Sequence, residues 1–314
     1  MSVQDREKEQ SFYAHGKLLI SGEYMVLNGA MALAVPLSKG QLMKVSPNSS
    51  PVFSWTAFSP AGEWFSVNFK NDLSVIDTND PQKAKTLKNI LTRAAAIKNV
   101  TPDFFAGKSV TTELEFDPNW GWGSSSTLIS NLSNWMEIDP YQLLSRTFGG
   151  SGYDLACSNA SGPVFYVLSG STPLHEPTQF NPPFEDQLWV VYLNKKQSSS
   201  KAIKEHLKKT QKKSLLIKEI SHISRQMSIE KSFENFSKLM IEHESVISGL
   251  IGWAPLKEKH FNDFPGAVKS LGAWGGDFFM ALSPLSDDET KKYFQTKGLN
   301  VLFKIKDIKL DSIK

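Results

Sequence analysis

The segment from Trp120 to Thr127 constrains this chain most, because it reads WGWGSSST and runs directly into the apolar stretch 128–132. Glycines let a backbone turn tightly with its N–H groups directed into the turn, and a helix that starts there adds the positive end of its dipole. Serine hydroxyls can cap such a helix or hold a metal ion. The segment therefore predicts a phosphate-binding loop at the start of a helix.

Two common phosphate-binding motifs are excluded for this segment, and one structural alternative stays open. No lysine follows Gly123, as a Walker A loop requires, and the third glycine of a Rossmann fingerprint is missing. Glycine and serine could also form only a turn and a helix cap. The flanking pattern favours phosphate binding, because a strand pattern from Val110 to Phe116 precedes the loop and a helical pattern follows it.

Length and composition predict an ordinary soluble protein of about two domains. The 314 residues are 40% hydrophobic and 21% charged, and the net charge of +3 is too small to indicate nucleic-acid binding. The single Cys157 excludes an internal disulfide and a cysteine zinc site. No apolar run reaches the length of a membrane span, and residues 1–11 lack the apolar core of a signal peptide. We therefore expect a cytoplasmic protein with a disordered leader over residues 1–11.

Hydrophobic periodicity places the other elements. The pattern predicts strands at 12–20, 41–45, 52–55, 64–69 and 110–116, a helix over 81–99, and further helices at 140–148 and 153–158. The stretch 171–183 contains four prolines and predicts a boundary between domains over 12–175 and 184–314. Beyond that boundary we expect two helices within 201–248 and strands at 188–193, 268–271, 278–282 and 301–306.

Three motifs follow one another in a fixed order. They occupy residues 15–29 (HGKLLISGEYMVLNG), 121–126 (GWGSSS) and 272–277 (GAWGGD). In this order they resemble the GHMP small-molecule kinases, which include galactokinase, homoserine kinase, mevalonate kinase and phosphomevalonate kinase. The resemblance covers nearly the whole chain. It implies an α+β, two-domain GHMP kinase fold, with an N-terminal ribosomal-protein-S5-like domain and a C-terminal ferredoxin-like αβ domain.

Within that family the chain is most similar to the mevalonate and phosphomevalonate kinases. The turn Gly22-Glu23-Tyr24 resembles phosphomevalonate kinases, and so do residues 150–156 (GSGYDLA) and 196–200 (KQSSS). The resemblance implies ATP-dependent phosphorylation of a small anionic metabolite, phosphomevalonate or mevalonate, in isoprenoid precursor synthesis. Two alternatives stay open: a decarboxylase of diphosphomevalonate, and a non-catalytic nucleotide-binding relative.

The resemblance also implies roles for individual residues. Asp154 would accept or orient the proton of the attacking group, and Lys17 would keep Asp154 ionised and stabilise the transferred phosphoryl group. The ATP-binding residues would be Gly121, Trp122, Gly123, Ser124, Ser125 and Ser126, and Ser125 would also hold Mg²⁺. The substrate-binding residues would be Lys17, Glu23, Ser151, Gly152, Gly275 and Gly276. For Glu23, a purely structural role in the turn carries equal weight.

Three positions depart from the family pattern. Trp122 and Trp274 stand where small residues are usual, so each indole must point away from the phosphates or wall off part of the pocket. We expect at least one of them to line the nucleotide site, and the alternative is that both face the core. Leu143 stands where mevalonate kinases carry a metal-binding glutamate, which argues against a standard mevalonate kinase. We expect ATP and Mg²⁺ as cofactors and neither nucleic acid nor membrane as a partner. A homodimer is retained as a candidate assembly.

Overall fold

The computed structural model describes residues 9–194, 213–274 and 276–311. They divide into two compact units, the first built from 1–16, 39–118 and 122–159 and the second from 17–38, 119–121 and 160–314. The sequence predicted two continuous domains that meet at 171–183. That boundary stays a prediction; the compact units are discontinuous, since strands β1 (Gln10–Ser21) and β2 (Ala32–Pro47) each contribute residues to both.

The first unit contains a mixed sheet. Its strands are ordered β5-β4-β3-β6-β2, and β1 also pairs with β2. The neighbours β3 and β6 are parallel, whereas β2–β6, β3–β4 and β4–β5 are antiparallel. The additional strands are β3 (Phe53–Ser59), β4 (Gly62–Phe69), β5 (Val75–Thr78) and β6 (Lys108–Leu114).

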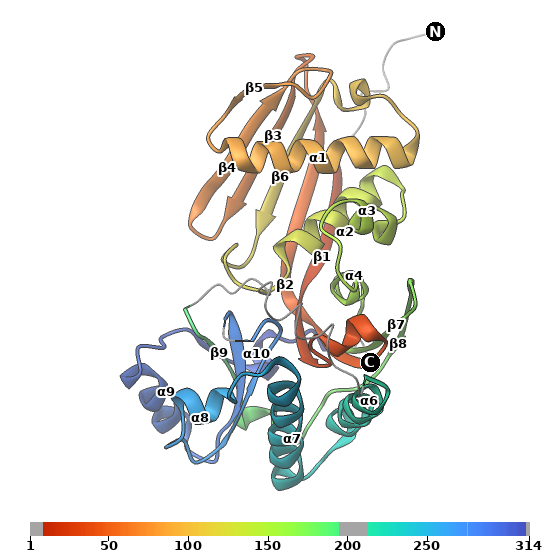
Figure 1. Ribbon diagram of the computed structural model, residues 1–314. Coiled ribbons are helices and arrows are strands. Elements are labelled where there is room, and N and C mark those ends of the chain that lie inside the picture. The colour runs from red at the N-terminus through yellow and green to blue at the C-terminus, as the bar shows by residue number, and fades with distance from the viewer. Residues whose placement is uncertain (1–8, 195–212, 275, 312–314) are drawn as a thin grey trace. The chain divides into compact units, whose positions relative to one another are not determined.

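Helix α1 (Pro81–Lys98) forms where the sequence pattern predicted it. The Asp80 side chain accepts hydrogen bonds from the amides of Gln82 and Lys83, and Pro81 occupies the first turn, where its missing N–H is not needed. The buried stripe of the helix consists of Ala84, Leu87, Ile90, Leu91, Ala94 and Ala95. This stripe belongs to the same hydrophobic core as the sheet, and Figure 1 shows α1 crossing the sheet beside β3, β4 and β6.

The remaining helical elements of the first unit lie along the same core. They are η2 (Pro102–Phe105), α2 (Ser124–Met136), α3 (Pro140–Arg146) and α4 (Tyr153–Ser158). Ile129 and Leu132 of α2 and Leu143 of α3 join the core of the sheet and α1. Helix α2 is therefore held rigidly, and its N-terminus carries the serine segment.

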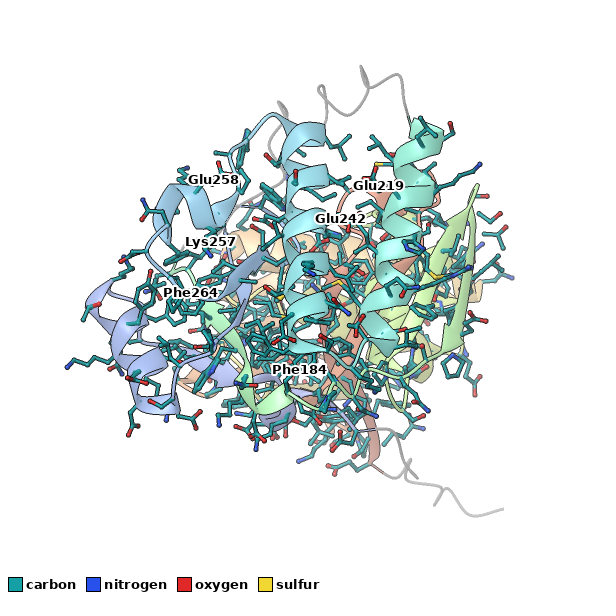
Figure 2. The ribbon with its side chains drawn as sticks, turned by 90° about the horizontal axis from the view of Figure 1, so that it is seen from below. Phe184, Glu219, Glu242, Lys257, Glu258 and Phe264 are labelled. Atoms are coloured by element: carbon teal, nitrogen blue, oxygen red, sulfur yellow. The ribbon has the colours of Figure 1, made fainter. Side chains whose placement is uncertain are left out.

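The second unit has an antiparallel sheet of order β10-β11-β9-β12, while β7 pairs with residues 32–34 of β2 and with β8. Helices α6 and α7 lie side by side in this unit, as Figure 2 shows from below. The elements are η1 (Met25–Asn28), β7 (Val164–Ser169), β8 (Thr172–Pro177), η3 (Glu185–Gln187), β9 (Leu188–Tyr192), α6 (Lys213–Ile229), α7 (Phe233–Ile251), α8 (Leu256–His260), β10 (Ala267–Ser270), β11 (Phe278–Leu282), α9 (Asp287–Thr296), β12 (Leu302–Lys304) and α10 (Ile305–Ile308).

Several elements differ from the sequence prediction. Strand β8 lies inside the proline-containing stretch that was predicted as a boundary, and Pro173 and Pro177 are tolerated because β8 is an edge strand. Strand β1 already begins at Gln10, within the predicted leader, and residues 1–8 lie outside the described part of the chain. The strand predicted over 301–306 ends at Lys304, where α10 follows.

Among the helices of the described residues, none is both long and apolar enough to cross a membrane.

Two glycines in the second unit generate a prediction on stability. A Cβ at Gly266 would collide with the carbonyl oxygen of Leu282 and lie 2.7 Å from the Phe264 ring, whereas a Cβ at Gly249, exposed on α7, would meet no atom within 4 Å. We expect Gly266→Ala to destabilise the protein by about 1–3 kcal/mol through overpacking. Gly249→Ala should stabilise it by up to about 1 kcal/mol, because alanine favours the helix. Urea unfolding midpoints test this pair, and equal midpoints would contradict it.

Candidate functional site

Lys17 lies in β1, and its side chain is held by the second glycine segment. The Nζ atom donates a hydrogen bond to the carbonyl oxygen of Gly121 at 2.7 Å. A Cβ at Gly121 would lie 2.8 Å from Asp277 Cγ and collide with the carboxylate, so only glycine fits there. The structure thus brings Lys17, Gly121 and Asp277 together within the second unit. Asp277 was not predicted as a site residue, although its position at the end of a glycine-rich motif and its φ of 51° mark it as unusual.

The serine segment starts helix α2, as the sequence predicted. Gly123 is the N-cap residue with φ 97°, a conformation that favours glycine. The buried Ser126 donates its hydroxyl hydrogen to the Gly123 carbonyl at 2.8 Å, so its side chain shapes the turn. Ser124 is half-buried and Ser125 is exposed, so both side chains are accessible at the start of the helix. The first amides of a helix have no partner within the helix, and they can bind an anion.

A cavity of about 240 Å³ lies beside this helix start, entirely within the first unit. Ser124, Ser125 and Leu128 of α2 line one part of it, and side chains of β2, β3, β4, β6 and α1, together with Phe148 after α3, line the rest. Its volume is below the roughly 300–1,000 Å³ of sites for drug-sized ligands, so it suits one flat ring system rather than a whole nucleotide.

The cavity walls combine aromatic and aliphatic side chains with one buried amide. Trp55, Trp64, Phe65 and Phe148 contribute ring surface. Gln41 is only 4% exposed, and its Oε1 atom has no hydrogen-bond partner among the described residues. Buried polar atoms in proteins nearly always have partners, so this oxygen is available to a ligand N–H group. The sequence analysis did not predict this cavity, because its walls come from six separate elements.

The two departing tryptophans occupy other places. Trp122 is fully buried and packs edge-to-face against Phe116, with ring centroids 5.8 Å apart. Trp274 is 2% exposed and lies in a hydrophobic cluster with Met25, Ile220 and Ile247. An indole without exposed surface cannot stack on a base. These positions favour the alternative in which both indoles face the interior, and the half-buried Trp64 takes the place that we expected for one of them.

Asp154 follows the glycine segment 149–152. Gly149, Gly150 and Gly152 have φ values of 67°, 109° and 83°, so this path of the backbone needs glycine at each of them. Asp154 lies half-buried in the first turn of α4, and Ser151 is half-buried beside it in the sequence. Burial and then the negative charge of Asp154 raise the pKa of Tyr141 to about 12. Tyr141 thus lies near the predicted base as a neutral phenol, and sequence reasoning missed it.

Glu23 is buried rather than open to a ligand. Its Oε1 atom accepts a hydrogen bond from Lys269 Nζ at 2.6 Å, and both side chains are fully buried. Burial alone would raise the pKa of Glu23, but the ammonium charge of Lys269 and its hydrogen bond outweigh burial, so the pKa is lowered. Substrate contact by Glu23 stays a prediction, and the structural alternative gains support. Gly275 lies outside the described residues, as does the segment 196–200, and Gly276 is buried in a turn.

The described residues contain no group of three histidine, cysteine, aspartate or glutamate side chains that could hold a metal ion. Leu143 is fully buried in α3 and offers no ligand. Mg²⁺ often keeps several waters and binds through substrate phosphates with one or two protein oxygens. The exposed Ser125 hydroxyl beside the predicted phosphate-binding loop fits that mode of binding.

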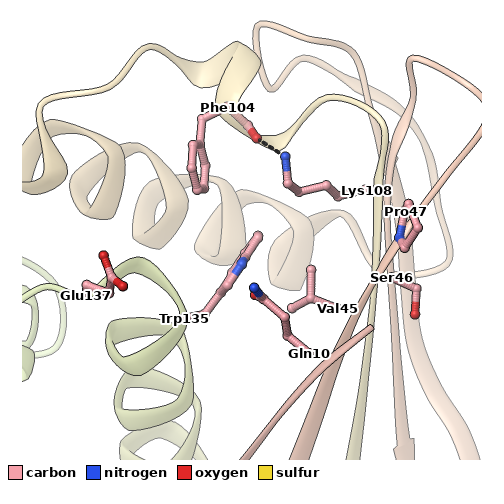
Figure 3. A pocket seen from close by; sticks show the side chains of 8 residues that line it. All are labelled: Gln10, Val45, Ser46, Pro47, Phe104, Lys108, Trp135 and Glu137. Atoms are coloured by element: carbon pink, nitrogen blue, oxygen red, sulfur yellow. Dashed lines mark hydrogen bonds between the residues drawn. The ribbon is translucent and has the colours of Figure 1, made fainter. Parts of the chain in front are cut away.

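A second cavity of about 180 Å³ lies elsewhere in the first unit, and Figure 3 shows its lining. Trp135 and Phe104 form apolar walls, and Lys108 Nζ is bonded to the Phe104 carbonyl oxygen at 2.8 Å. None of the residues predicted for the site lines this cavity.

Comparisons with known proteins identify the fold. No family model and no curated protein matches the chain. Among solved structures, the Methanococcus jannaschii mevalonate kinase is similar with a TM-score of 0.69 at 14% identity, over 98% of this chain and 99% of that one. The Streptococcus pneumoniae phosphomevalonate kinase, in complex with phosphomevalonate and AMPPNP, gives 0.66 at 16% identity, over 94% and 100%.

A third solved structure has a different substrate. The Lactococcus lactis galactokinase, complexed with galactose, is similar with a TM-score of 0.67 at 11% identity, over 99% of this chain and 95% of that one. Three kinases of different specificity thus match nearly the full length of the chain. They show that it has the two-domain fold of the GHMP kinases.

Proposed function

We propose that this protein is an ATP-dependent kinase that phosphorylates a small anionic metabolite, with phosphomevalonate and mevalonate as the leading candidates. The observation that carries the proposal is the base-sized aromatic cavity that lies directly beside Ser124 and Ser125 at the start of α2. A ring-binding cavity next to a phosphate-binding helix start is the arrangement that a nucleoside triphosphate needs. The GHMP kinase fold supports the same conclusion.

The first unit would bind ATP. The base would enter the cavity between Trp64 and Phe148, where the Gln41 amide can hydrogen-bond its polar edge. The phosphates would lie at the segment 121–126, where the helix start and Ser124 bind them. Ser125 would hold Mg²⁺ together with phosphate oxygens, and the ion would neutralise charge on the transferred group.

Asp154 and Lys17 would carry the chemical step. Phosphoryl transfer depends mainly on positioning and charge neutralisation. Asp154 would accept the proton of the attacking hydroxyl or phosphate, and the Lys17 ammonium would stabilise negative charge on the transferred phosphoryl group. The substrate would be bound by Lys17, Ser151, Gly152, Gly275 and Gly276. A cytoplasmic location and a homodimer stay predictions.

The proposal is tested by ADP release with a panel of acceptors: mevalonate, phosphomevalonate, diphosphomevalonate, homoserine and galactose. We expect Mg²⁺-dependent turnover with one of the mevalonate-derived acceptors. Absence of turnover with all five, in a protein that unfolds cooperatively, would contradict the proposal.

We expect Asp154→Asn to lower kcat by about 10²-fold or more and to leave ATP binding nearly unchanged. The substitution keeps the size of the side chain and removes its ability to accept a proton. Steady-state kinetics and ATP titration of the purified variant measure both effects. Turnover close to wild type would exclude Asp154 as the base.

We expect Ser125→Ala to raise the Mg²⁺ concentration needed for half-maximal activity, because a hydroxyl ligand is lost. A magnesium titration at fixed ATP measures the shift. Ser145→Ala is the matched control, since the Ser145 hydroxyl is bonded to the Gln142 carbonyl oxygen within α3. If the Ser125→Ala and wild-type titrations superimpose, Ser125 is not a metal ligand.

We expect ATP to change the tryptophan emission of the protein, and Trp64→Phe to remove most of that change. A base stacked on Trp64 gains about 0.5–1.5 kcal/mol beyond burial, so Trp64→Ala should weaken ATP binding by up to about tenfold. Trp122→Leu and Trp274→Gly should keep the optical response, because both indoles are buried away from this cavity. If Trp122→Leu or Trp274→Gly loses the response instead, that indole lines the nucleotide site, as the sequence analysis expected.

A further inference from the structure

The third glycine motif forms the loop between the antiparallel strands β10 and β11. The amide of Leu271 donates to the carbonyl oxygen of Phe278 at 3.1 Å, and this bond closes the loop. The described motif residues, 272–274 and 276–277, therefore lie in a short connection whose two ends are fixed by the sheet. Glycine gives a backbone many accessible conformations, so a defined shape of this loop requires contacts with other parts of the protein.

One further contact fixes the middle of the loop. The backbone amide of Trp274 donates a hydrogen bond to the hydroxyl oxygen of Tyr24 at 3.0 Å. The Trp274 indole is buried among residues of η1, α6 and α7. Both the main chain and the side chain of Trp274 are thus held by other parts of the second unit.

Tyr24 itself is held in an unfavourable conformation. Its φ of 60° lies in the left-handed region, which non-glycine residues rarely adopt and which stores roughly 1–3 kcal/mol of strain. It follows Gly22 and Glu23 in the turn after β1. The Gly22 amide donates to His243 Nε2 at 3.1 Å, and Glu23 accepts from Lys269, which is in the strand that leads into the loop. The turn therefore contacts the loop-bearing segment at its start and in its middle.

The charges in this contact are entirely buried. Lys269 Nζ bonds to Glu23 and to the Ser270 carbonyl oxygen, and Glu244 accepts hydrogen bonds from the amide and the hydroxyl of Ser270. Glu244 is a buried residue of α7, whereas Glu242 on the same helix, labelled in Figure 2, is exposed. Burying an ion pair rarely adds stability over apolar packing, but it favours one geometry over others.

A defined loop geometry matters because the loop reaches the candidate site. Asp277 closes the loop, and its carboxylate lies against Gly121, whose carbonyl oxygen holds Lys17. A shift of the loop would move Asp277 against Gly121 and displace the acceptor of the Lys17 hydrogen bond.

We propose that Tyr24, with Glu23 and Lys269 beside it, is a positioning residue that fixes the loop 272–277 and, through Asp277 and Gly121, the ammonium group of Lys17. The proposal rests on the proposed function where it concerns catalysis. It goes beyond that function by assigning the turn Gly22-Glu23-Tyr24 a task that needs no contact with the substrate.

The direct test is Tyr24→Phe, which removes only the hydroxyl group. We expect kcat to fall by about tenfold with the KM for ATP unchanged, because the lost bond aligns Lys17 and the ATP-binding cavity is untouched. Hydrogen exchange at the amides of 272–278 should rise by at least about tenfold, because the Trp274 amide loses its acceptor. The control is Tyr293→Phe, which removes a hydroxyl bonded to the exposed Asp263 and should change neither quantity.

The two measurements separate this proposal from the proposed function. If no acceptor is phosphorylated by the wild type, the kinase proposal fails, while hydrogen exchange still tests the restraint on the loop. Unchanged exchange at 272–278 in Tyr24→Phe would overturn the positioning role, and so would unchanged kcat in an active enzyme.

A second variant guards against loss of folding. Glu23→Gln leaves the buried Lys269 without its counter-charge and could prevent folding. In Glu23→Gln/Lys269→Met both charges are removed together, and we expect a folded protein in which exchange of the loop again rises. A double variant with wild-type exchange would contradict the role assigned to the ion pair.

Discussion

The hydrogen bond from Lys17 Nζ to the Gly121 carbonyl oxygen is the interaction on which the candidate site depends. It joins a strand near the start of the chain to a loop 104 residues later, and it fixes the position of an ammonium group. Asp277 occupies the space that a side chain at position 121 would need, so the residue that accepts this bond must be glycine. The glycine is thus required by packing, whatever the loop binds.

Each of the two units has a feature of its own that bears on the proposed function. The first unit provides a rigid aromatic cavity, supported by a core in which α1 and α2 pack on the sheet. The second unit contains a glycine-rich loop at 272–277. Tyr24 bonds to this loop, and the buried Glu23–Lys269 ion pair lies next to it. Rigid support for a loop that must approach a phosphate closely is physically reasonable, because misplacement of reacting groups by about 1 Å can lower a rate by two orders of magnitude.

The sequence predicted the helices whose start and apolar face depend on residues close together in the chain. Helix α1 was predictable from its apolar stripe and the cap at Asp80, and α2 was predictable from its start after Gly123. The cavity was not predictable, because Gln41, Trp55 and Trp64 come from three strands whose order is set only by tertiary pairing. Lys269 looked like an ordinary strand residue, since nothing local indicates that Glu23 lies opposite. The orientation of Trp122 and Trp274 likewise depends on which core accepts the indole.

The central claim is that this protein transfers the γ-phosphoryl group of ATP to a small acceptor. The most direct measurement is ³¹P NMR of ATP and Mg²⁺ incubated with the protein and each candidate acceptor. A kinase produces ADP and one new phosphate ester or diphosphate resonance in equal amounts, without free inorganic phosphate, and this is the result that we expect. If ATP is split into ADP and inorganic phosphate only when diphosphomevalonate is present, with release of CO₂, the reaction is a decarboxylation instead. Unchanged ATP with every acceptor would contradict the account.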